Sequence, residues 1–362
     1  MKKTEGGVCA PIGFKANGVH CGIRKNKTKR DLSLIVSDVR CAAACVYTQN
    51  LVKGAPIAVT KSHVADGYAQ AIVCNSGNAN TCNANGIEIA EGMCSLVSEK
   101  TGIPAADVVV ASTGVIGQPL SLEPIAAGMD ELVRGLGDNS LYAAQGIMTT
   151  DTVDKQIAYT FTLGGKECRI GAIGKGVGMI NPNMATMLIF ITTDVSISPA
   201  MLQKALSADV KDSFNMVSVD GDTSTNDMVC VLANGLAGND TIEENGKDFV
   251  TFRKALNKVT TNLCRRIAKD GEGATKLLEC KVVGAKSKSA AKLIAKSVIK
   301  SSLFKAAMFG ADANWGRVLC AIGYAGADAD IHKIDVDFKS REGTLAVCRG
   351  GSGIPFSEEE AK

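Results

Sequence analysis

The sequence predicts an α+β fold, in which strand-like and helix-like segments follow one another in mixed order without a regular strand–helix–strand repeat. Hydrophobic residues make up 46% of the 362 residues and charged residues 21%, a balance typical of a globular protein. A chain of this length has room for one large domain or about two. No stretch rich in Pro or Ser marks a linker between domains.

The first half of the chain begins with short runs of strand-forming residues. They predict strands at 33–36, 46–50, 56–60 and 71–75. Apolar residues at helical spacing then predict a helix over 86–102, followed by a strand over 107–113. A second helix is expected over 121–136, with Ser121 as its candidate N-cap.

The second half continues in the same mixed order. Two strands joined at a Gly-Gly pair are expected over 156–176, since such a pair between apolar runs is a hairpin signal. The apolar run 184–195 predicts a buried strand, and the spacing over 247–270 predicts a long amphipathic helix. Lysines spread over 286–305 predict one solvated helix face, with anion binding as the alternative.

The composition argues against several classes of protein. Lys and Arg number 40 and Asp and Glu 37, and the net charge of +3 does not favour a nucleic-acid or anionic-membrane partner. Aromatic residues are only 4%, so base-stacking platforms are not expected. The N-terminus has no apolar signal-peptide core, and no window approaches the roughly 18 apolar residues of a membrane span. We therefore expect a cytoplasmic enzyme.

Metal and nucleotide sites are also not expected. The 13 cysteines are scattered without a CxxC pair, so most are expected to be small core residues in a reducing compartment. Only three histidines are present, which argues against a metal site or a His-based triad. GAIGKGVG at 171–178 fits no nucleotide-loop spacing, and DGDTSTND at 220–227 lacks the Gly and Glu of a calcium loop.

One threonine is a candidate nucleophile. Thr186 stands where a polar, Pro-containing loop meets the apolar run, and spacing alone favours an ordinary strand residue there. A threonine hydroxyl needs a base to become a nucleophile, and almost no histidine is available. If the chain is cut between Ala185 and Thr186, the new α-amine of Thr186 can act as that base, because its pKa lies near about 8.

The segment KGVGMINPNMATMLIFITTD at 175–194 closely resembles the self-cleavage segment of the glutamate N-acetyltransferase (ornithine acetyltransferase) family of arginine biosynthesis. Further blocks resemble the same family in the same order: NSGNAN (75–80), ASTGVIG (111–117), IMTTDT (147–152), DGDTSTND (220–227), DGEGATK (270–276) and GADANWGRVLCAIGYAG (310–326). The resemblance runs from residue 6 to the C-terminus. It implies the α+β fold of self-cleaving N-terminal-nucleophile enzymes, which aminopeptidases of similar fold share.

The resemblance implies self-cleavage between Ala185 and Thr186, giving an α chain of residues 1–185 and a β chain of residues 186–362 that assemble as α2β2. Thr186 then takes the acetyl group of N2-acetylornithine, ornithine leaves, and glutamate accepts the acetyl group in a ping-pong reaction. No cofactor or metal is required, because Thr186 itself carries the acetyl group. Some members of the family also accept acetyl-CoA, which makes it a second candidate donor.

The same resemblance implies roles for other residues. Thr113 and Gly114 would form the oxyanion hole, through a hydroxyl and a backbone N–H. Lys175 would bind a substrate carboxylate, and Glu272 would pair with a substrate amino group. Thr149 would bind substrate through its hydroxyl, with Thr152 as the alternative.

The C-terminal segment departs from the family's pattern. Members usually continue by a few dozen residues beyond a segment like IPFSEEEAK at 354–362, and that continuation ends in an Asn and a Thr or Ser that contact substrate. Since this chain ends at Lys362, we expect self-cleavage with poor acetyl transfer. Two alternatives remain open: an aminopeptidase or amidohydrolase of similar fold that releases the acyl group to water, and an inactive truncated relative.

Overall fold

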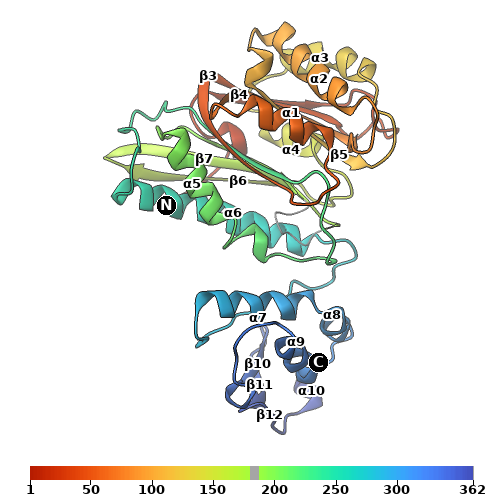
Figure 1. Ribbon diagram of the computed structural model, residues 1–362, viewed down its shortest axis with the longest axis vertical. Helices are drawn as coiled ribbons and strands as arrows, with labels where there is room; N and C mark the ends of the chain where they lie inside the picture. Colours follow the sequence, from red (N-terminus) through yellow and green to blue (C-terminus); the bar gives the residue numbers. More distant parts are fainter. Residues whose placement is uncertain (180–186, 362) are drawn as a thin grey trace. The chain divides into compact units, whose positions relative to one another are not determined.

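The computed structural model describes residues 1–179 and 187–361 and divides into two compact units (Figure 1). The first unit contains residues 1–217 and 222–272, and the second contains residues 218–221 and 273–362. Each unit has its own cluster of buried apolar side chains. No helix among the described residues is both long and apolar enough to cross a membrane.

Nine described strands of the first unit form a continuous hydrogen-bonded sheet. They are β1 (Lys2–Thr4), β2 (Phe14–Val19), β3 (Leu32–Tyr47), β4 (Tyr68–Asn78), β5 (Val108–Val115), β6 (Lys155–Leu163), β7 (Lys166–Lys175), β8 (Leu188–Thr193) and β9 (Met228–Ala233). The strand order is β1-β6-β7-β8-β9-β3-β4-β5, and β2 also pairs with β3. The pairs β4–β5 and β8–β9 are parallel, and the other pairs are antiparallel.

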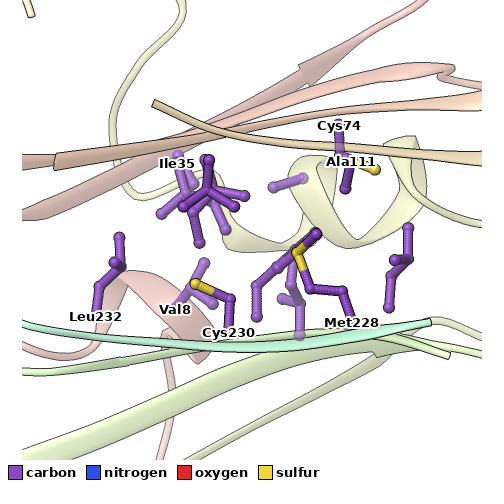
Figure 2. Packing of buried hydrophobic residues seen from close by; sticks show 14 of the residues in the cluster. Val8, Ile35, Cys74, Ala111, Met228, Cys230 and Leu232 are labelled. Carbon is purple, nitrogen blue, oxygen red and sulfur yellow. The ribbon is translucent and has the colours of Figure 1, made fainter. Parts of the chain in front are cut away.

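The sheet folds into two stacked layers, and the long strand β3 contributes to both. Its first part pairs with β2 and β4, its register shifts between Val36 and Cys41, and its last part pairs with β9. Figure 2 shows the core between the layers, where Ile35 and Cys74 face Cys230 and Leu232. Burying apolar side chains between two sheet faces is the main stabilising contribution of such a sandwich.

Helices cover both outer faces of the two layers and fill one part of the space between them (Figure 1). The helices α1 (Ala55–His63), α2 (Gly86–Thr101) and α3 (Glu123–Arg134) pack on the β2–β5 side, and α5 (Pro199–Asp209) and α6 (Lys247–Lys269) lie on the opposite side. The short α4 (Ser140–Gly146) contributes Ala143 and Ala144 to the inner core. The 3-10 turns η1 (Gly7–Cys9), η2 (Ala105–Asp107) and η3 (Phe214–Met216) complete this unit.

Most of the predicted elements are confirmed. The predicted strands at 71–75 and 107–113 fall on β4 and β5, and the predicted helices at 86–102 and 247–270 are α2 and α6. The predicted hairpin is β6 and β7, and both turn glycines have positive φ (53° and 82°). The described part of 184–195 forms the buried strand β8. Most of the cysteines are buried.

The strand prediction for 56–60 is wrong, since this segment lies in α1. Pro56 occupies the first turn of the helix, where its missing N–H removes no intrahelical hydrogen bond. Thr60 Oγ1 donates to the backbone oxygen of Val110 at 2.7 Å and accepts from its nitrogen at 2.9 Å. Burial against β5 therefore outweighs the strand preference of the β-branched residues.

Three smaller differences concern boundaries and missed strands. The segments 33–36 and 46–50 do not form two strands, because the first and the start of the second belong to β3. Leu122, not Ser121, is the N-cap of α3, although Ser121 Oγ accepts the N–H of Glu123 at 3.2 Å. The strands β2 and β9 were not predicted, although β9 is a continuous apolar run of the kind that indicates a buried strand.

The second unit combines helices with a small antiparallel sheet. Its elements are α7 (Lys288–Lys300), α8 (Ser302–Phe309), α9 (Trp315–Gly323), η4 (Ile331–Lys333), β10 (Val336–Lys339), β11 (Thr344–Arg349), β12 (Ser352–Gly353) and α10 (Glu358–Ala361). The prediction of one lysine-bearing helix face is confirmed for the lysines at 288, 292, 296 and 300, which lie on α7, and is wrong for Lys305, because Ser301 separates α7 from α8. Its backbone is extended and its Oγ accepts the N–H of Phe304 at 3.2 Å.

Candidate active site

Thr113 and Gly114, which we call the β5 turn, lie at the end of β5 where its pairing with β4 becomes irregular. Thr113 pairs with both Ser76 and Asn78 across a register shift. Gly114 has a φ of 135°, and a Cβ at this position would overlap the backbone of Gly77. Only glycine fits here without moving the turn.

Neutral polar side chains hold the backbone around this turn, and we call Asn75, Asn78 and Ser112 the neutral network. The Ser112 hydroxyl donates to Asn75 Oδ1 at 2.6 Å, and Asn75 Nδ2 donates to the backbone oxygen of Asn78 at 3.0 Å. Asn78 Nδ2 in turn donates to the backbone oxygen of Gln118 at 3.0 Å. All three side chains are buried. The network contains no ionisable group, so its geometry does not depend on pH.

A second group, Asp151, Lys155, Lys175 and Asp270, forms what we call the charged cluster. Lys155 is fully buried, and its Nζ lies 2.8 Å from Asp151 Oδ1 and 2.6 Å from Asp270 Oδ2. Lys175, at the end of β7, is also buried, with its Nζ 3.9 Å from Asp151 Oδ2. Removing one partner from such a group leaves an uncompensated buried charge.

The charges of the cluster shift one another's pKa values. Burial by itself raises the pKa of Asp151, but the charges of Lys175 and Lys155 outweigh burial and hold that pKa below its usual value. Burial lowers the pKa of Lys175, against the opposing charge of Asp151. For Asp270, hydrogen bonds from Lys155 and Thr152 outweigh burial, and the pKa is again lowered.

The charged cluster also positions the two alternative threonines. Asp151 accepts the backbone N–H of Thr149 at 3.0 Å and that of Gly176 at 2.9 Å. Asp270 accepts both the backbone N–H and the hydroxyl of Thr152. The Thr152 hydroxyl is therefore engaged in the fold, whereas the Thr149 hydroxyl makes no hydrogen bond to another described residue.

Glu272 follows α6 and lies beside the chain segment that leaves β7. Its backbone N–H donates to the backbone oxygen of Val177 at 2.9 Å. A Cβ on Gly178 would come within 2.9 Å of the Glu272 carboxylate, so the absence of a side chain there leaves room for it. Glu272 is exposed, in contrast to the buried Lys175 on the neighbouring segment.

Arg24 connects the surroundings of the β5 turn with those of Thr149. Its guanidinium donates to the backbone oxygens of Met148 and Thr149, each at 2.9 Å. Its Cγ would lie 2.8 Å from a Cβ placed on Gly77, the register partner of Gly114. The structure therefore brings Thr113, Gly114 and Thr149 to one region. Ala185 and Thr186, the predicted cleavage pair, lie outside the described residues, which resume at Met187.

Comparison with known proteins identifies the family. The profile of the ArgJ family matches residues 15–362. The arginine biosynthesis bifunctional protein ArgJ of Caldanaerobacter subterraneus subsp. tengcongensis is 47% identical over 364 residues, covering 100% of this chain and 90% of the relative. The chain belongs to the ArgJ family. Family membership confirms the resemblance drawn from the sequence and the α+β fold that it implied.

Further similar proteins include another relative and two solved structures. ArgJ 1 of Clostridium acetobutylicum is 49% identical over 351 residues, covering 96% of this chain and 86% of the relative. Among solved structures, ArgJ of Bacillus halodurans has 38% identity and a TM-score of 0.47, and the match covers 50% of this chain and 96% of the solved one. The ornithine acetyltransferase of Mycobacterium tuberculosis, solved in complex with ornithine, has 32% identity and a TM-score of 0.46, covering 50% and 98%.

Asp151, Lys155 and Asp270 were not predicted from the sequence as parts of the site. Two of the three lie inside blocks that resemble the family, IMTTDT and DGEGATK, and the spacing of four residues between Asp151 and Lys155 was a further signal. Charged residues are mostly exposed in proteins, so sequence alone gave no reason to bury these three. The burial of these three side chains and their pairing with one another became evident only from the packing of α6 against β6.

Proposed function

We propose that this chain is an acetyltransferase of arginine biosynthesis that moves the acetyl group of N2-acetyl-L-ornithine to L-glutamate. The products are L-ornithine and N-acetyl-L-glutamate. The observation that carries the proposal is the placement of Lys175 and Glu272 on segments joined by the 2.9 Å bond between Glu272 and Val177. A buried ammonium and an exposed carboxylate on two hydrogen-bonded segments suit a substrate that has both a carboxylate and an amino group.

Before the first turnover the peptide bond between Ala185 and Thr186 is hydrolysed: one water molecule supplies the hydroxyl of the new Ala185 carboxyl group and the proton of the freed Thr186 α-amine. The freed α-amine of Thr186 accepts the proton of its hydroxyl as the oxygen attacks the acetyl carbonyl. The Thr113 hydroxyl and the Gly114 N–H stabilise the resulting oxyanion. The carbon–nitrogen bond then breaks, the departing ornithine amine takes the proton from the α-amine, and Thr186 retains the acetyl group.

Glutamate completes the cycle by the same steps in reverse order. Its amino group attacks the acetyl ester, the oxyanion forms again at the β5 turn, and the Thr186 hydroxyl is restored. Lys175 binds the α-carboxylate of each amino acid, and Glu272 binds an amino group of the substrate. Thr149 is preferred to Thr152 as a substrate ligand, since the Thr152 hydroxyl is bonded to Asp270.

Thr186 carries the acetyl group between the two half-reactions, so the proposed reaction needs no cofactor. Acetyl-CoA is a second candidate donor, because its thioester presents the same acetyl carbonyl to the nucleophile. We also propose that the cleaved chains assemble as α2β2, which a native mass measurement of the purified protein tests directly.

The first test is a denaturing intact mass of the purified protein beside its Thr186→Ala variant. We expect two pieces that meet between residues 185 and 186 in the wild type, and an uncut chain of 37.6 kDa in the variant. Thr251→Ala is the matched control, because the hydroxyl of this partly buried threonine donates to the backbone oxygen of Lys247 within α6. An uncut wild type would show that Thr186 is never freed, and the mechanism would fail.

The second test follows ornithine release from acetylornithine with and without glutamate. We expect release beyond one equivalent per active site only when glutamate is present. Release at the same rate without glutamate would identify a hydrolase of similar fold. No release from a correctly cleaved protein would identify an inactive relative.

A further inference from the structure

The side chains of the consecutive residues Asn226 and Asp227 each hold a backbone group close in sequence to the proposed catalytic centre. One group precedes the oxyanion-hole residue Thr113, and the other follows the nucleophile Thr186. Asn226 Nδ2 donates to the backbone oxygen of Ser112 at 2.9 Å. Asp227 Oδ1 accepts the backbone N–H of Met187 at 2.8 Å. Ser112 directly precedes Thr113 in the chain, and Met187 directly follows Thr186. Each contact is therefore one residue away from a proposed catalytic group.

The orientation of the Asn226 amide is determined by four hydrogen bonds. Its Nδ2 also donates to the backbone oxygen of Ala79 at 2.6 Å, and its Oδ1 accepts the hydroxyls of Thr81 and Thr225, each at 2.6 Å. An amide has two donor hydrogens and an oxygen with two lone pairs, and all of them are used here. A carboxylate at this position would place an oxygen against two carbonyl oxygens. The site therefore requires an amide.

Met187, which the Asp227 side chain holds, is held a second time by the next residue, Met228. The backbone oxygen of Met187 accepts the N–H of Met228 at 3.0 Å, and the parallel pairing of β8 with β9 begins one residue later. Asp227 is buried, and burial raises the pKa of its carboxyl well above the usual value, partly offset by the Met187 N–H and the Lys175 charge. The buried Asp227 and its contact leave Met187, the residue directly before β8, little freedom.

We propose that Asn226 and Asp227 are a positioning pair that sets the separation between Met187, the residue that follows Thr186 in the sequence, and the β5 turn. This inference rests on the proposed function. Consecutive Cα atoms are only about 3.8 Å apart, so the two contacts are linked by the shortest covalent path a chain offers. A displacement of about 1 Å between reacting groups can reduce a rate by about 100-fold, so such a link matters for catalysis. Neither side chain touches substrate in this proposal.

The test compares Asn226→Asp and Asp227→Ala with the conservative variant Asp227→Asn. Self-cleavage is measured by denaturing intact mass, and kcat and KM for acetylornithine are then measured per cleaved chain. We expect Asn226→Asp and Asp227→Ala to slow self-cleavage and to lower kcat by about 10- to 100-fold, with KM changed less than about threefold. Asp227→Asn keeps an oxygen that accepts the Met187 N–H, so it should be at least about 10-fold more active than Asp227→Ala.

Matched controls come from a buried amide and a buried carboxylate elsewhere in the same unit. Asn239 donates to the backbone oxygen of Ser196 at 3.1 Å, and Asp209 accepts from Asn257 at 2.8 Å. Asn239→Ala and Asp209→Ala should unfold at lower temperature but keep kcat within about twofold of the wild type while folded, because neither contacts a residue adjacent to the site. Thermal melts of all variants establish which fraction is folded at the assay temperature.

Three outcomes would overturn the inference. If Asn226→Asp and Asp227→Ala match the two controls in kcat, the pair has no positioning role, while the proposed function stands. If Asp227→Ala does not fold, the folded Asn226→Asp variant decides the question alone, and a normal kcat in it counts against the pair. If the wild type neither cleaves at residue 186 nor transfers acetyl, the proposed function and this inference fail together.

Discussion

The side chains that hold the β5 turn differ in kind from those that hold Thr149 and Lys175. The first set is a network of amides and hydroxyls without a formal charge, whereas the second depends on two buried lysines and two aspartates. Both sets are buried and both hold backbone by hydrogen bonds. The loss of one member has a different cost in each set, because an unpaired buried charge costs more free energy than an unpaired amide or hydroxyl.

This difference matches the tasks that we propose for the two sides. An oxyanion that forms and disappears in each cycle is best met by fixed neutral donors, which need no reorganisation. A substrate carboxylate is present throughout, and a buried cation binds it only if neighbouring charges keep the cation ionised. Asp151 provides that support for Lys175, against the effect of burial. Substitutions on the two sides test this contrast.

The largest effect is expected for Lys155→Met. The variant leaves Asp151 and Asp270 buried without their shared cation, and such losses reduce the free energy of unfolding by about 3–5 kcal/mol. Urea unfolding at neutral pH measures the change. Lys15→Met is the control, because Lys15 forms a 2.7 Å ion pair with Asp38 while half of its side chain is exposed, and should cost less than about 1 kcal/mol. Equal losses of unfolding free energy in Lys155→Met and Lys15→Met would show that the buried cluster does not depend on its lysine more than a surface ion pair does.

Asp151→Asn should have a smaller effect that depends on pH. Losing the charged acceptor of Lys155 and of two backbone N–H groups should cost about 1.5–3 kcal/mol at neutral pH. Because the pKa of Asp151 is lowered in the folded state, its stabilising contribution is complete above the usual value of 3.8 and is lost as the pH falls below it towards the folded-state value. Urea unfolding between pH 3 and pH 7 should show wild type and variant converging at the acid end.

For Asp209, the same measurement should show stability changing with pH in the opposite direction. Burial raises the pKa of Asp209 in the folded state, so its contribution to stability is lost as the pH rises through that raised value. The wild type should therefore lose stability relative to Asp209→Asn as the pH increases from 3 to 7. If both aspartates gave the same slope, pairing with the lysines would not be what distinguishes Asp151.

The smallest effect is expected in the neutral network. Ser112→Ala leaves Asn75 Oδ1 buried without its 2.6 Å partner, which should cost about 1–2 kcal/mol. No ionisable group is involved, so the loss should be the same at pH 5 and pH 8. Ser95→Ala, at an exposed position of α2, should change stability by less than about 0.5 kcal/mol. If the stability lost in Ser112→Ala varied with pH, an ionisable group would also influence the neutral network.

The sequence by itself determined the elements with strong local signals. The helices α2 and α6 and the hairpin of β6 and β7 follow from apolar spacing and a Gly-Gly turn, which act over a few neighbouring residues. The family also followed from the sequence, since several blocks in one order are specific where a single motif is not. The candidate residues Thr113, Gly114, Lys175 and Glu272 came with that resemblance.

Only the tertiary structure decided which segments and charges are buried together. The segment 56–60 is a helix because it packs on β5, which no local pattern records. Lys155 is 115 residues from Asp270 in the sequence, and Asn226 is 114 residues from Ser112. Contacts of this range depend on how strands and helices stack, and a charge becomes part of a site only when stacking removes it from water.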